Sequence, residues 1–456
     1  MDYEFNKLTD VQQYFHGLKM TGGQYLMKED DTPISLLGLE NDKFAYYSPI
    51  HEKASTETPS DGVIRYKANM AHHRIMAMEY RQIWPEVKIF QKFKGKVQIC
   101  WTHNRGTNCF TKVSFNVGNT FITSCDNAGI DVLNVTQRSK NMKDFHKRMG
   151  NIQGTEEWTE TLVSDSTNPI LPWWFSRSTG SFLPLFLFAP DVVNFDFEVR
   201  DKITSLLRMR TKEDDGSWRE LSRDEIERDG MSYLEPMKEK LKPAECIFFY
   251  IDSLKDEIDR ILNNPECNKD NQVYNFEYLF EDVIVGDADN DYKYGMDTTI
   301  TPEIQFPSKF TVGLACNLQA ESKNLYSNYT TSDSDVYGGN YPISMIKWQG
   351  PNNKSISFDL LTVSTYINLL LKKAPITNGY FIMPRSIRLD EIEDRNGISY
   401  KNNQIKFKIS IEDTGSKKQD KNSTFKILTR SIVCRTFVFS YNYNSKKFNW
   451  SLDSQI

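Results

Sequence analysis

The chain has 456 residues, and its length and composition already exclude several classes of protein. A chain of this length can bury sizeable cores without disulfide support, which excludes the small disulfide-stapled folds. Its 56 basic and 61 acidic residues give a formal net charge of -5. This balance provides no basic surface for a phosphate backbone, so we expect no direct binding of nucleic acid.

The N-terminal segment MDYEFNKLTDVQQYF carries charges of both signs and no apolar h-region, so we expect no secretory signal. Apolar side chains give residues 1–20 a modest amphipathic pattern, which is compatible with an arm or with a fraying terminus. These side chains are Tyr3, Phe5, Leu8, Val11 and Phe15.

The seven cysteines are odd in number and include no C-x-x-C pair, which indicates free thiols in a reducing compartment. They are Cys100, Cys109, Cys125, Cys246, Cys267, Cys316 and Cys434. The most apolar stretch, 181–190, has about half the length of a bilayer span and contains Pro184 and Pro190. We therefore expect a chain that stays in the cytoplasm and has no transmembrane helix.

Apolar and polar residues alternate in segments along the whole chain, and 13% of all residues are aromatic. Period-two alternation is typical of strands with one buried face, and aromatic side chains suit such pleated surfaces. The clearest segments are 96–102, 112–118, 194–200, 355–361 and 404–412. Turn-forming residues separate these segments and no long βαβ alternation is present, so we predict an all-β chain of antiparallel sandwiches.

Helical patterns are few, and we predict helices at 139–149, within 222–241 and at 253–264. Ser222 and Glu225 have the spacing of a capping box, in which a serine hydroxyl and a glutamate satisfy the first backbone amides of a helix. Ser253 and Asp256 have a related spacing. We expect these helices to lie in the connections between strands.

Three polar segments interrupt the alternating pattern. The segment 208–243 is densely charged, and we interpret it as an inserted surface loop. The segments 285–301 and 413–424 are interpreted as exposed loops for the same reason.

Two patterns could suggest a metal site, and we expect neither to form one. His72 and His73 are adjacent, so on a strand or a helix their side chains point in different directions and one ion cannot easily bind both. The second pattern, Asp287-x-Asp289-x-Asp291, opens like an EF-hand loop. It has Tyr292 where that loop needs glycine and Thr298 where it needs glutamate, which favours a solvated acidic loop.

No motif for covalent hydrolysis or nucleotide chemistry is present, so we expect no catalytic residue and no cofactor site. The carboxylate pair Glu156 and Glu157 could serve a glycosidase, but 61 acidic residues produce such pairs by chance. The run Trp173, Trp174 and Phe175 could form a carbohydrate platform. Three consecutive aromatic residues more often mark a strand buried on both faces or an interface.

The most distinctive segment is 169–200, PILPWWFSRSTGSFLPLFLFAPDVVNFDFEVR. It has a leucine-proline pair followed by aromatic residues, then Arg177, Gly180, a second leucine-proline pair at Leu183 and Pro184, and an alternating strand from Val193. This order of features resembles the signature of the major capsid proteins of the nucleocytoplasmic large DNA viruses.

Three other segments are similar to that family in the expected order. They are 113–134, which resembles a strand that leads to a helix, 246–262, which resembles the passage between two barrels, and 378–409, which resembles the last barrel strands. In the last segment Arg395, Asn396 and Gly397 replace the usual proline-serine-glycine. The resemblance covers about residues 96–456, and the first 95 residues contain no family motif.

The resemblance implies two tandem eight-stranded antiparallel jelly rolls, the double jelly-roll fold. We expect an N-terminal arm at 1–20, a first jelly roll at 21–250 with an insertion at about 208–243, and a second jelly roll at 251–456. Double-sheet jelly rolls leave only short, protected strand edges, which limits uncontrolled strand addition.

The resemblance also implies a structural role in the virion and no enzymatic activity. The chain would form homotrimeric, pseudo-hexagonal capsomers that tile an icosahedral shell and that assemble in the host cytoplasm. Its partners would be other copies of itself, neighbouring capsomers, minor capsid proteins and, through the arm, an internal membrane. Two alternatives stay open: a minor capsid or scaffold protein of the same fold, and a glycan-binding or glycan-cleaving double jelly-roll protein.

Overall fold

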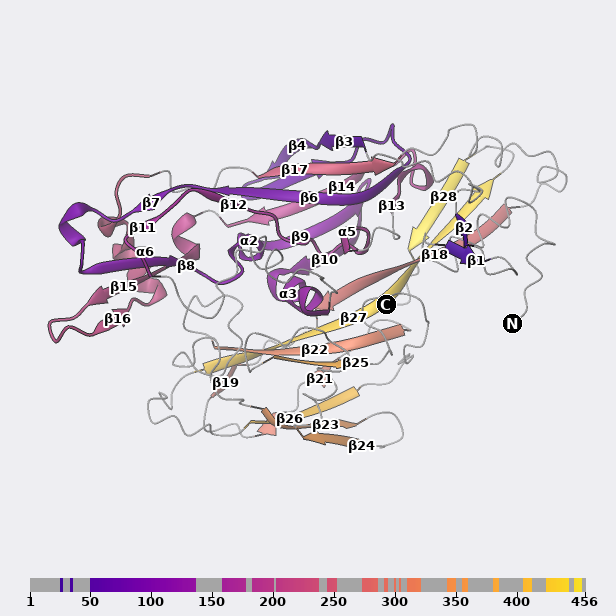
Figure 1. Cartoon of the computed structure of the whole chain (residues 1–456). Coiled ribbons are helices and arrows are strands. Elements are labelled where there is room, and N and C mark those ends of the chain that lie inside the picture. Colours follow the sequence, from indigo (N-terminus) through magenta and orange to yellow (C-terminus); the bar gives the residue numbers. More distant parts are fainter. Residues whose placement is uncertain are drawn as a thin grey trace.

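The computed structural model describes most of the first part of the chain and the strands of the second part. The described residues are 25–27, 33–35, 50–136, 158–177, 183–200, 202–237, 244–251, 273–285, 291–293, 299–300, 303–304, 310–320, 343–349, 355–359, 380–384, 405–411, 424–442 and 447–452. Figure 1 shows two β-sheet bodies, one built by residues 50–251 (the first half) and the other by residues 273–452 (the second half).

Two antiparallel sheets form the first half. The outer five-stranded sheet has the strand order β10 (Thr120–Asp126), β9 (Phe110–Val117), β14 (Val193–Val199), β5 (Val63–Lys67) and β4 (Ser55–Ser60). The sheet that faces it has the order β12 (Asp165–Thr167), β6 (Arg74–Trp84), β17 (Glu245–Ile251) and β3 (Ile50–Lys53), with β13 (Leu183–Pro184) also paired to β6.

Alternation along each strand decides which side chains face the other sheet. In β9, Val113, Phe115 and Val117 are buried, whereas Lys112 and Ser114 lie on the opposite face. The register of β9 with β14 places apolar residues of the two strands side by side on the inner face. One face of the sheet therefore contributes to the core and the other faces outward.

Aromatic rings join the two sheets of the first half. Tyr80 of β6 stacks on Phe197 of β14 at 4.9 Å between ring centroids, and it meets Tyr66 of β5 edge-on at 6.4 Å. Phe195 of β14 packs on Phe248 of β17 at 5.6 Å. These rings are almost completely buried, so they form the centre of a face-to-face β-sandwich.

A third antiparallel sheet projects from one end of this sandwich (Figure 1, left). It has the order β16 (Trp218–Glu220), β15 (Leu207–Lys212) and β8 (Val97–Trp101). The helix α6 (Arg223–Asp229) and the 3-10 helix η6 (Gly230–Tyr233) follow it. The two-stranded pair β7 (Val87–Lys88) and β11 (Thr161–Leu162) lies at the same end.

The prediction of a surface loop over 208–243 was wrong for residues 208–212, 218–220 and 223–233, which form strands and helices, whereas residues 213–217 form an exposed turn. The charged side chains of this segment misled the sequence interpretation, because Arg208 is buried in β15, where its guanidinium forms a bidentate pair with Glu220 at 2.7 Å. The predicted helix within 222–241 is confirmed as the shorter α6. The predicted capping box is also confirmed: the Glu225 amide donates to Ser222 Oγ, and the Glu225 carboxylate accepts from the Ser222 amide.

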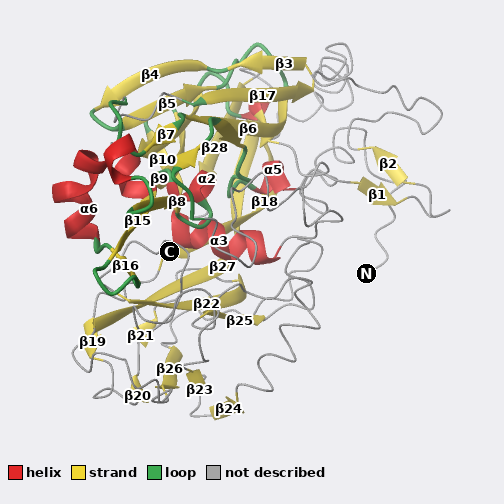
Figure 2. Cartoon of the chain, turned by 60° about the vertical axis from the view of Figure 1, so that its left-hand side comes forward, coloured by secondary structure: helices red, strands yellow, loops and turns green. Residues whose placement is uncertain are grey.

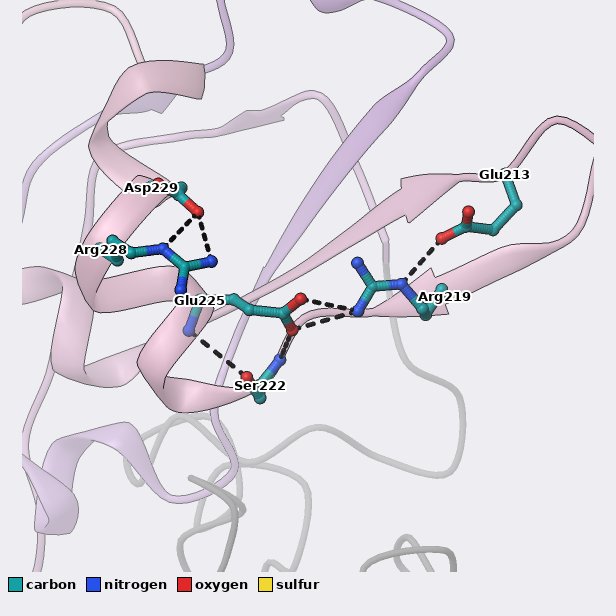
Figure 3. Close-up of polar contacts among 6 residues, drawn as sticks. All are labelled: Glu213, Arg219, Ser222, Glu225, Arg228 and Asp229. Atoms are coloured by element: carbon teal, nitrogen blue, oxygen red, sulfur yellow. Dashed lines mark hydrogen bonds and ion pairs between the residues drawn. The ribbon is translucent and has the colours of Figure 1, made fainter.

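Figure 3 shows ion pairs between the hairpin of β15 and β16 and the helix α6, and one within α6. Arg219 of β16 donates to Glu213 at 2.8 Å and to Glu225 of α6 at 3.0 Å. Arg228 donates to Asp229 at 2.9 Å. Exposed pairs of this kind add little stability individually.

The second half also contains two antiparallel sheets, which lie as two layers in Figures 1 and 2. One has the order β18 (Val273–Val285), β27 (Thr424–Asn442), β22 (Phe310–Ala320) and β25 (Tyr380–Pro384), with β19 (Asp291–Lys293) and β28 (Lys447–Leu452) also paired to β27. The other has the order β20 (Thr299–Ile300), β26 (Ile405–Ile411), β23 (Ile343–Gln349) and β24 (Ser355–Asp359), with β21 (Glu303–Ile304) also paired to β26.

The remaining elements are short. They are the helices α2 (Arg105–Asn108), α3 (Asn127–Thr136) and α5 (Trp174–Arg177), the 3-10 helices η3 (Gln91–Phe93), η4 (Leu185–Leu187) and η5 (Ile203–Leu206), and the strand pair β1 (Tyr25–Met27) and β2 (Pro33–Ser35). No helix among the described residues is both long and apolar enough to span a bilayer.

All five segments predicted as strands from alternation are confirmed, as β8, β9, β14, β24 and β26. The predicted helices at 139–149 and 253–264 lie outside the described residues, and so does the predicted loop at 413–424 except for Thr424, which begins β27. The segment 285–301, predicted as a loop, contains the two short strands β19 and β20. Backbone pairing to β27 and β26 explains these strands, because a polar sequence can still form an edge strand.

Candidate functional site

The aromatic run of Trp173, Trp174 and Phe175 is buried between the two halves of the chain. Each of the three side chains is at most 3% exposed, so the carbohydrate-platform interpretation is wrong. The prediction of a strand is also wrong, because the run enters the single helical turn α5. The alternative of an interface is correct: Trp174 packs on Phe280 of β18, in the second half, at 4.6 Å between ring centroids.

The rest of the distinctive segment continues this contact, which we name the inter-half contact. Phe188 follows η4 in the first half and packs on Phe437 and Phe439 of β27 at 5.1 and 5.3 Å. Phe437 also reaches Phe115 of β9 at 6.4 Å and stacks on Phe280 at 4.6 Å. The side chains of both halves thus belong to one continuous hydrophobic cluster.

The C-terminal strand β28 covers the edge of the aromatic cluster. Trp450 packs on Phe188 at 5.7 Å, and its indole Nε1 donates a hydrogen bond to Asp191 Oδ2 at 3.0 Å. Phe448 of the same strand packs on Phe186 at 6.2 Å. The strand β28 of the second half therefore packs against the segment 184–191 of the first half.

A polar part of the inter-half contact lies along β10, an edge strand of the outer sheet. Arg430 of β27 is 3% exposed, and its Nε donates to Asp126 Oδ1 at 3.0 Å while Nη2 pairs with the second carboxylate oxygen. Asp126 Oδ1 also accepts from the Gly129 amide at 2.9 Å, at the start of α3. One carboxylate therefore caps a helix of the first half and neutralises a buried arginine of the second.

A second buried set lies beside the first. Asp282 of β18 accepts from Thr123 Oγ1 at 2.6 Å and from Arg435 Nη1 at 2.8 Å. Arg435 Nη1 also donates to the backbone carbonyl of Ile122 at 2.8 Å. Burial raises the pKa of Asp282, and the nearby charge of Arg435 and the hydrogen bond from Thr123 oppose this shift.

These contacts protect the exposed edge of β10 without adding a strand to it. An edge strand presents unpaired carbonyl and amide groups that can recruit another chain. Here an arginine of the second half satisfies one such carbonyl, and an aspartate binds a threonine hydroxyl of the same strand. The polar set therefore joins β10 to the second half and satisfies one backbone carbonyl of that edge.

The two adjacent histidines make separate contacts. His72 Nε2 lies 2.7 Å from Glu52 Oε1, and its ring stacks on Tyr250 at 4.3 Å. His73 packs edge-on against Phe186 at 6.4 Å. The structure does not bring the two rings to one point. Within the described ranges no group of three or more histidine, cysteine or acidic side chains could hold a metal ion.

The acidic candidates are placed only in part. Glu156, Glu157, Asp287 and Asp289 lie outside the described residues. Asp291 belongs to β19, where it is opposite Lys426 of β27. The proposed acidic loop therefore ends in a paired strand.

Four cysteines, Cys100, Cys109, Cys125 and Cys246, have free, buried thiols. Burial raises the pKa of Cys109 to about 12 and that of Cys246 well above its ordinary value. Such thiols are poor nucleophiles near neutral pH, so in the described part of the chain they act as small core residues.

Sequence reasoning missed Asp126, Asp282, Arg430 and Arg435. A signal for three of them was present, because Asp282, Arg430 and Arg435 alternate in phase with apolar residues such as Phe280, Ile432 and Phe437. A buried charge requires a partner, and such residues mark a contact even when the partner cannot be named.

The chain was compared with known proteins. No protein-family model matches its sequence, and no curated protein does. Its structure is similar to that of a chain of the PBCV-1 virus capsid, with a TM-score of 0.61 and 10% sequence identity over 88% of this chain and 96% of that chain.

Two further solved structures are similar. PBCV-1 VP54, in a crystal structure fitted into a cryo-EM reconstruction of the virophage Sputnik, matches with a TM-score of 0.59 and 10% identity over 91% of this chain and 99% of that chain. The Faustovirus major capsid protein matches with a TM-score of 0.54 and 7% identity over 87% and 92%. The predicted fold class is confirmed: the chain is mostly β, with antiparallel sheets that match the double jelly-roll capsid proteins.

Proposed function

We propose that this double jelly-roll chain is a structural capsid protein of a large double-stranded DNA virus. In this proposal three copies form a pseudo-hexagonal capsomer, and capsomers tile an icosahedral shell in the virion. The likeness of the fold to solved capsid-protein structures is the observation that carries it. The rings of Phe115, Phe188, Phe280 and Phe437 are buried in one cluster shared by both halves, and in this proposal the cluster holds the two β-sandwiches together as one rigid subunit.

Rigidity matters for a tiling function. A trimer is pseudo-hexagonal only if each subunit contributes two similar sandwiches at a fixed angle. A hinge between the two sandwiches would change the positions of the surfaces that contact neighbouring capsomers. Buried aromatic packing and the two buried charge sets supply that fixed angle. Binding to other copies, and not turnover, is the task that this architecture serves.

In this proposal the chain has three structural units and several kinds of partner. The units are an arm at 1–20, a first jelly roll at 21–250 and a second at 251–456. The partners are other copies, neighbouring capsomers, minor capsid proteins and, through the arm, the internal membrane, with no direct contact to nucleic acid. Assembly takes place in the host cytoplasm, and the chain needs no catalytic residue, cofactor or metal.

The mass of the purified full chain in solution tests this proposal. One chain has a mass of 53.0 kDa, so a trimer has three times that mass, about 159 kDa. Light scattering coupled to size-exclusion chromatography should give the trimer mass at micromolar concentration. A monomer at every concentration that also binds glycans would contradict the proposal.

The alternative of a minor capsid or scaffold protein shares the fold and the trimer, so copy number in purified virions separates it from the main shell component. The glycan-binding alternative depended on an exposed aromatic platform, and the side chains of Trp173, Trp174 and Phe175 are buried. No other observation in the described residues favours that alternative.

A further inference from the structure

The two halves of the chain repeat one strand order. In the first half β3 pairs with β17 and β17 with β6, while β5, β14, β9 and β10 are neighbours in the facing sheet. In the second half β18, β27 and β22 have the first of these orders, and β20, β26, β23 and β24 have the second. The strands β3 and β17 therefore correspond to β18 and β27, and the edge strand β10 corresponds to the edge strand β24.

The inter-half contact joins two of these surfaces. The first half contributes its edge strand β10 with α3 and α5, and the second half contributes one face of β18 and β27. Phe280 and Asp282 of β18 lie on this face together with Arg435 and Phe437 of β27, because Phe280 is opposite Arg435 and the other two residues follow by alternation. Figures 1 and 2 show the first half on one side of this sheet and the sheet of β26, β23 and β24 on the other. An edge of one sandwich thus packs on the outer face of the next.

The corresponding surface of the first half is the outward face of β3, β17 and β6, which we name the β17 face. Cys246, Phe248 and Tyr250 of β17 are buried in the interior of the sandwich, and alternation turns Ile247 and Phe249 outward, where they are half-buried. A strand that is apolar on both faces is typical of a strand that is covered on both sides. The sequence of β17 therefore indicates a cover on its outward side.

The strand β27 has the same property, and its cover lies within the chain. Ile432 and Phe437 are on opposite faces of β27, and both are completely buried. The first half covers the side of Phe437. The corresponding strands of the two halves are thus both built to be packed on from outside.

The β17 face combines an apolar centre with a charged rim. Phe249 packs on the ring of His51 of β3 at 4.5 Å between centroids. Beside it, Ile247 is opposite Lys53, and Lys53 Nζ donates to Glu245 at 3.1 Å. Apolar side chains within a polar rim are the arrangement found in protein interfaces.

We propose that the β17 face binds the edge strand β24 of a second copy of the chain, so that the contact between subunits repeats the contact between the halves. The inference rests on the proposed homotrimer and names the two surfaces that meet in it. Such a contact is heterologous, because the β17 face of one copy meets a different surface of the next copy.

The repeated strand order identifies the second copy as the occupant. Each chain contains one contact of an edge with a face, which leaves the β17 face and the edge strand β24 at opposite ends of the chain (Figures 1 and 2). Three copies arranged head to tail form a ring in which every half offers one edge and one face. Described side chains beside this edge are open to a partner: Met345 of β23 is 37% exposed, and the opposite Asp359 of β24 is exposed as well.

The first test compares Ile247→Asp and Phe249→Asp with the control Phe121→Asp. Phe121 is 55% exposed and lies in the other sheet of the first half, opposite Asn116. Sedimentation of each full-length variant over a range of concentrations gives the trimer dissociation constant. Both variants of the β17 face should raise it at least about tenfold, and Phe121→Asp should leave it unchanged. Circular dichroism checks that each variant is folded.

A cross-linking measurement keeps the test decisive if the aspartate variants do not fold. A photoreactive phenylalanine analogue at position 249 keeps the aromatic ring, and a mixture of isotopically light and heavy chains distinguishes links between chains from links within one. Links from position 249 to residues 343–359 of another chain support the proposal. A trimer in which position 249 links only to other segments, or to no other chain, overturns this inference and leaves the proposed function intact. Folded aspartate variants that trimerise like the wild type have the same meaning, and a wild-type chain that is always monomeric overturns both proposals.

Discussion

Arg430 and Asp126, which are 304 positions apart in the sequence, form a bidentate ion pair that joins β27 of the second half to the end of β10 in the first. The arginine is almost completely buried, and the aspartate is partly open to solvent. Because the same aspartate caps α3, its two roles can be separated by substitution.

Asp126→Asn should keep the α3 cap and lose the charge that neutralises Arg430. We expect the free energy of unfolding to fall by about 1–3 kcal/mol, since a buried cation loses its partner. Asp126→Ala should cost about 1 kcal/mol more, because the helix also loses its cap. Urea unfolding of both variants measures the difference, and Asp61→Asn, on an exposed turn, is the control. Equal losses for Asn and Ala would show that the cap contributes nothing.

Phe437→Ala should destabilise both halves of the chain together. The side chain is fully buried and contacts rings of the first half, so its truncation should cost about 3–5 kcal/mol. Hydrogen exchange followed by mass spectrometry should show faster exchange in β9 and β14 as well as in β27. Met209→Ala, in the projecting sheet, is a buried control away from the inter-half contact, and its effect on exchange should be largest in β8 and β15. Faster exchange confined to the second half would mean that the halves unfold independently.

The sequence was sufficient to predict strands, because alternation depends on each segment alone. Val113, Phe115 and Val117 had to share a face whatever lay opposite them. The Ser222 to Glu225 spacing was likewise local, and it marked the start of α6 correctly. Charge was the misleading signal: Arg208 looked solvent-exposed, but it is buried against Glu220 and lies 5.1 Å from the centre of the Trp158 ring.

The inter-half contact could not be predicted from the same patterns. Period-two alternation states which face of a strand is buried, but it does not name the strand that covers that face. Trp174 and Phe280 are in separate halves, and nothing in their local sequences links them. The family resemblance located the segment 169–200 as important, and its packing against β18, β27 and β28 explains why its aromatic residues are there.

Asp282 should make the stability of the wild-type chain depend on pH in a way that Asp282→Asn removes. Burial raises the pKa of Asp282 in the folded chain above its ordinary value of 3.8, so the folded state binds this proton more tightly than the unfolded state. The contribution of this group is complete below pH 3.8 and is lost as the pH rises through the folded-state pKa. The unfolding free energy of the wild type minus that of Asp282→Asn should therefore fall over this range.

Urea unfolding of both proteins at closely spaced pH values measures this difference. Thr123→Val is a useful companion, because it removes a hydrogen bond that favours the charged carboxylate and should extend the fall to higher pH. A difference that increases with pH would mean that the attraction of Arg435 outweighs burial and lowers the pKa of Asp282.

Cys109 should resist alkylation in the folded chain. Burial raises its pKa to about 12, so roughly one thiol in ten thousand is ionised at pH 8, and the sulfur is also out of contact with solvent. Iodoacetamide followed by peptide mass spectrometry should leave Cys109 unmodified in buffer and modify it in urea. Asp61→Cys, which places a thiol on an exposed turn, is the control and should react under both conditions. Reaction of Cys109 in buffer at the rate of the control thiol would show that the interior between β6 and β14 opens to solvent, and a subunit with such an opening would not be the rigid body that the proposed capsomer requires.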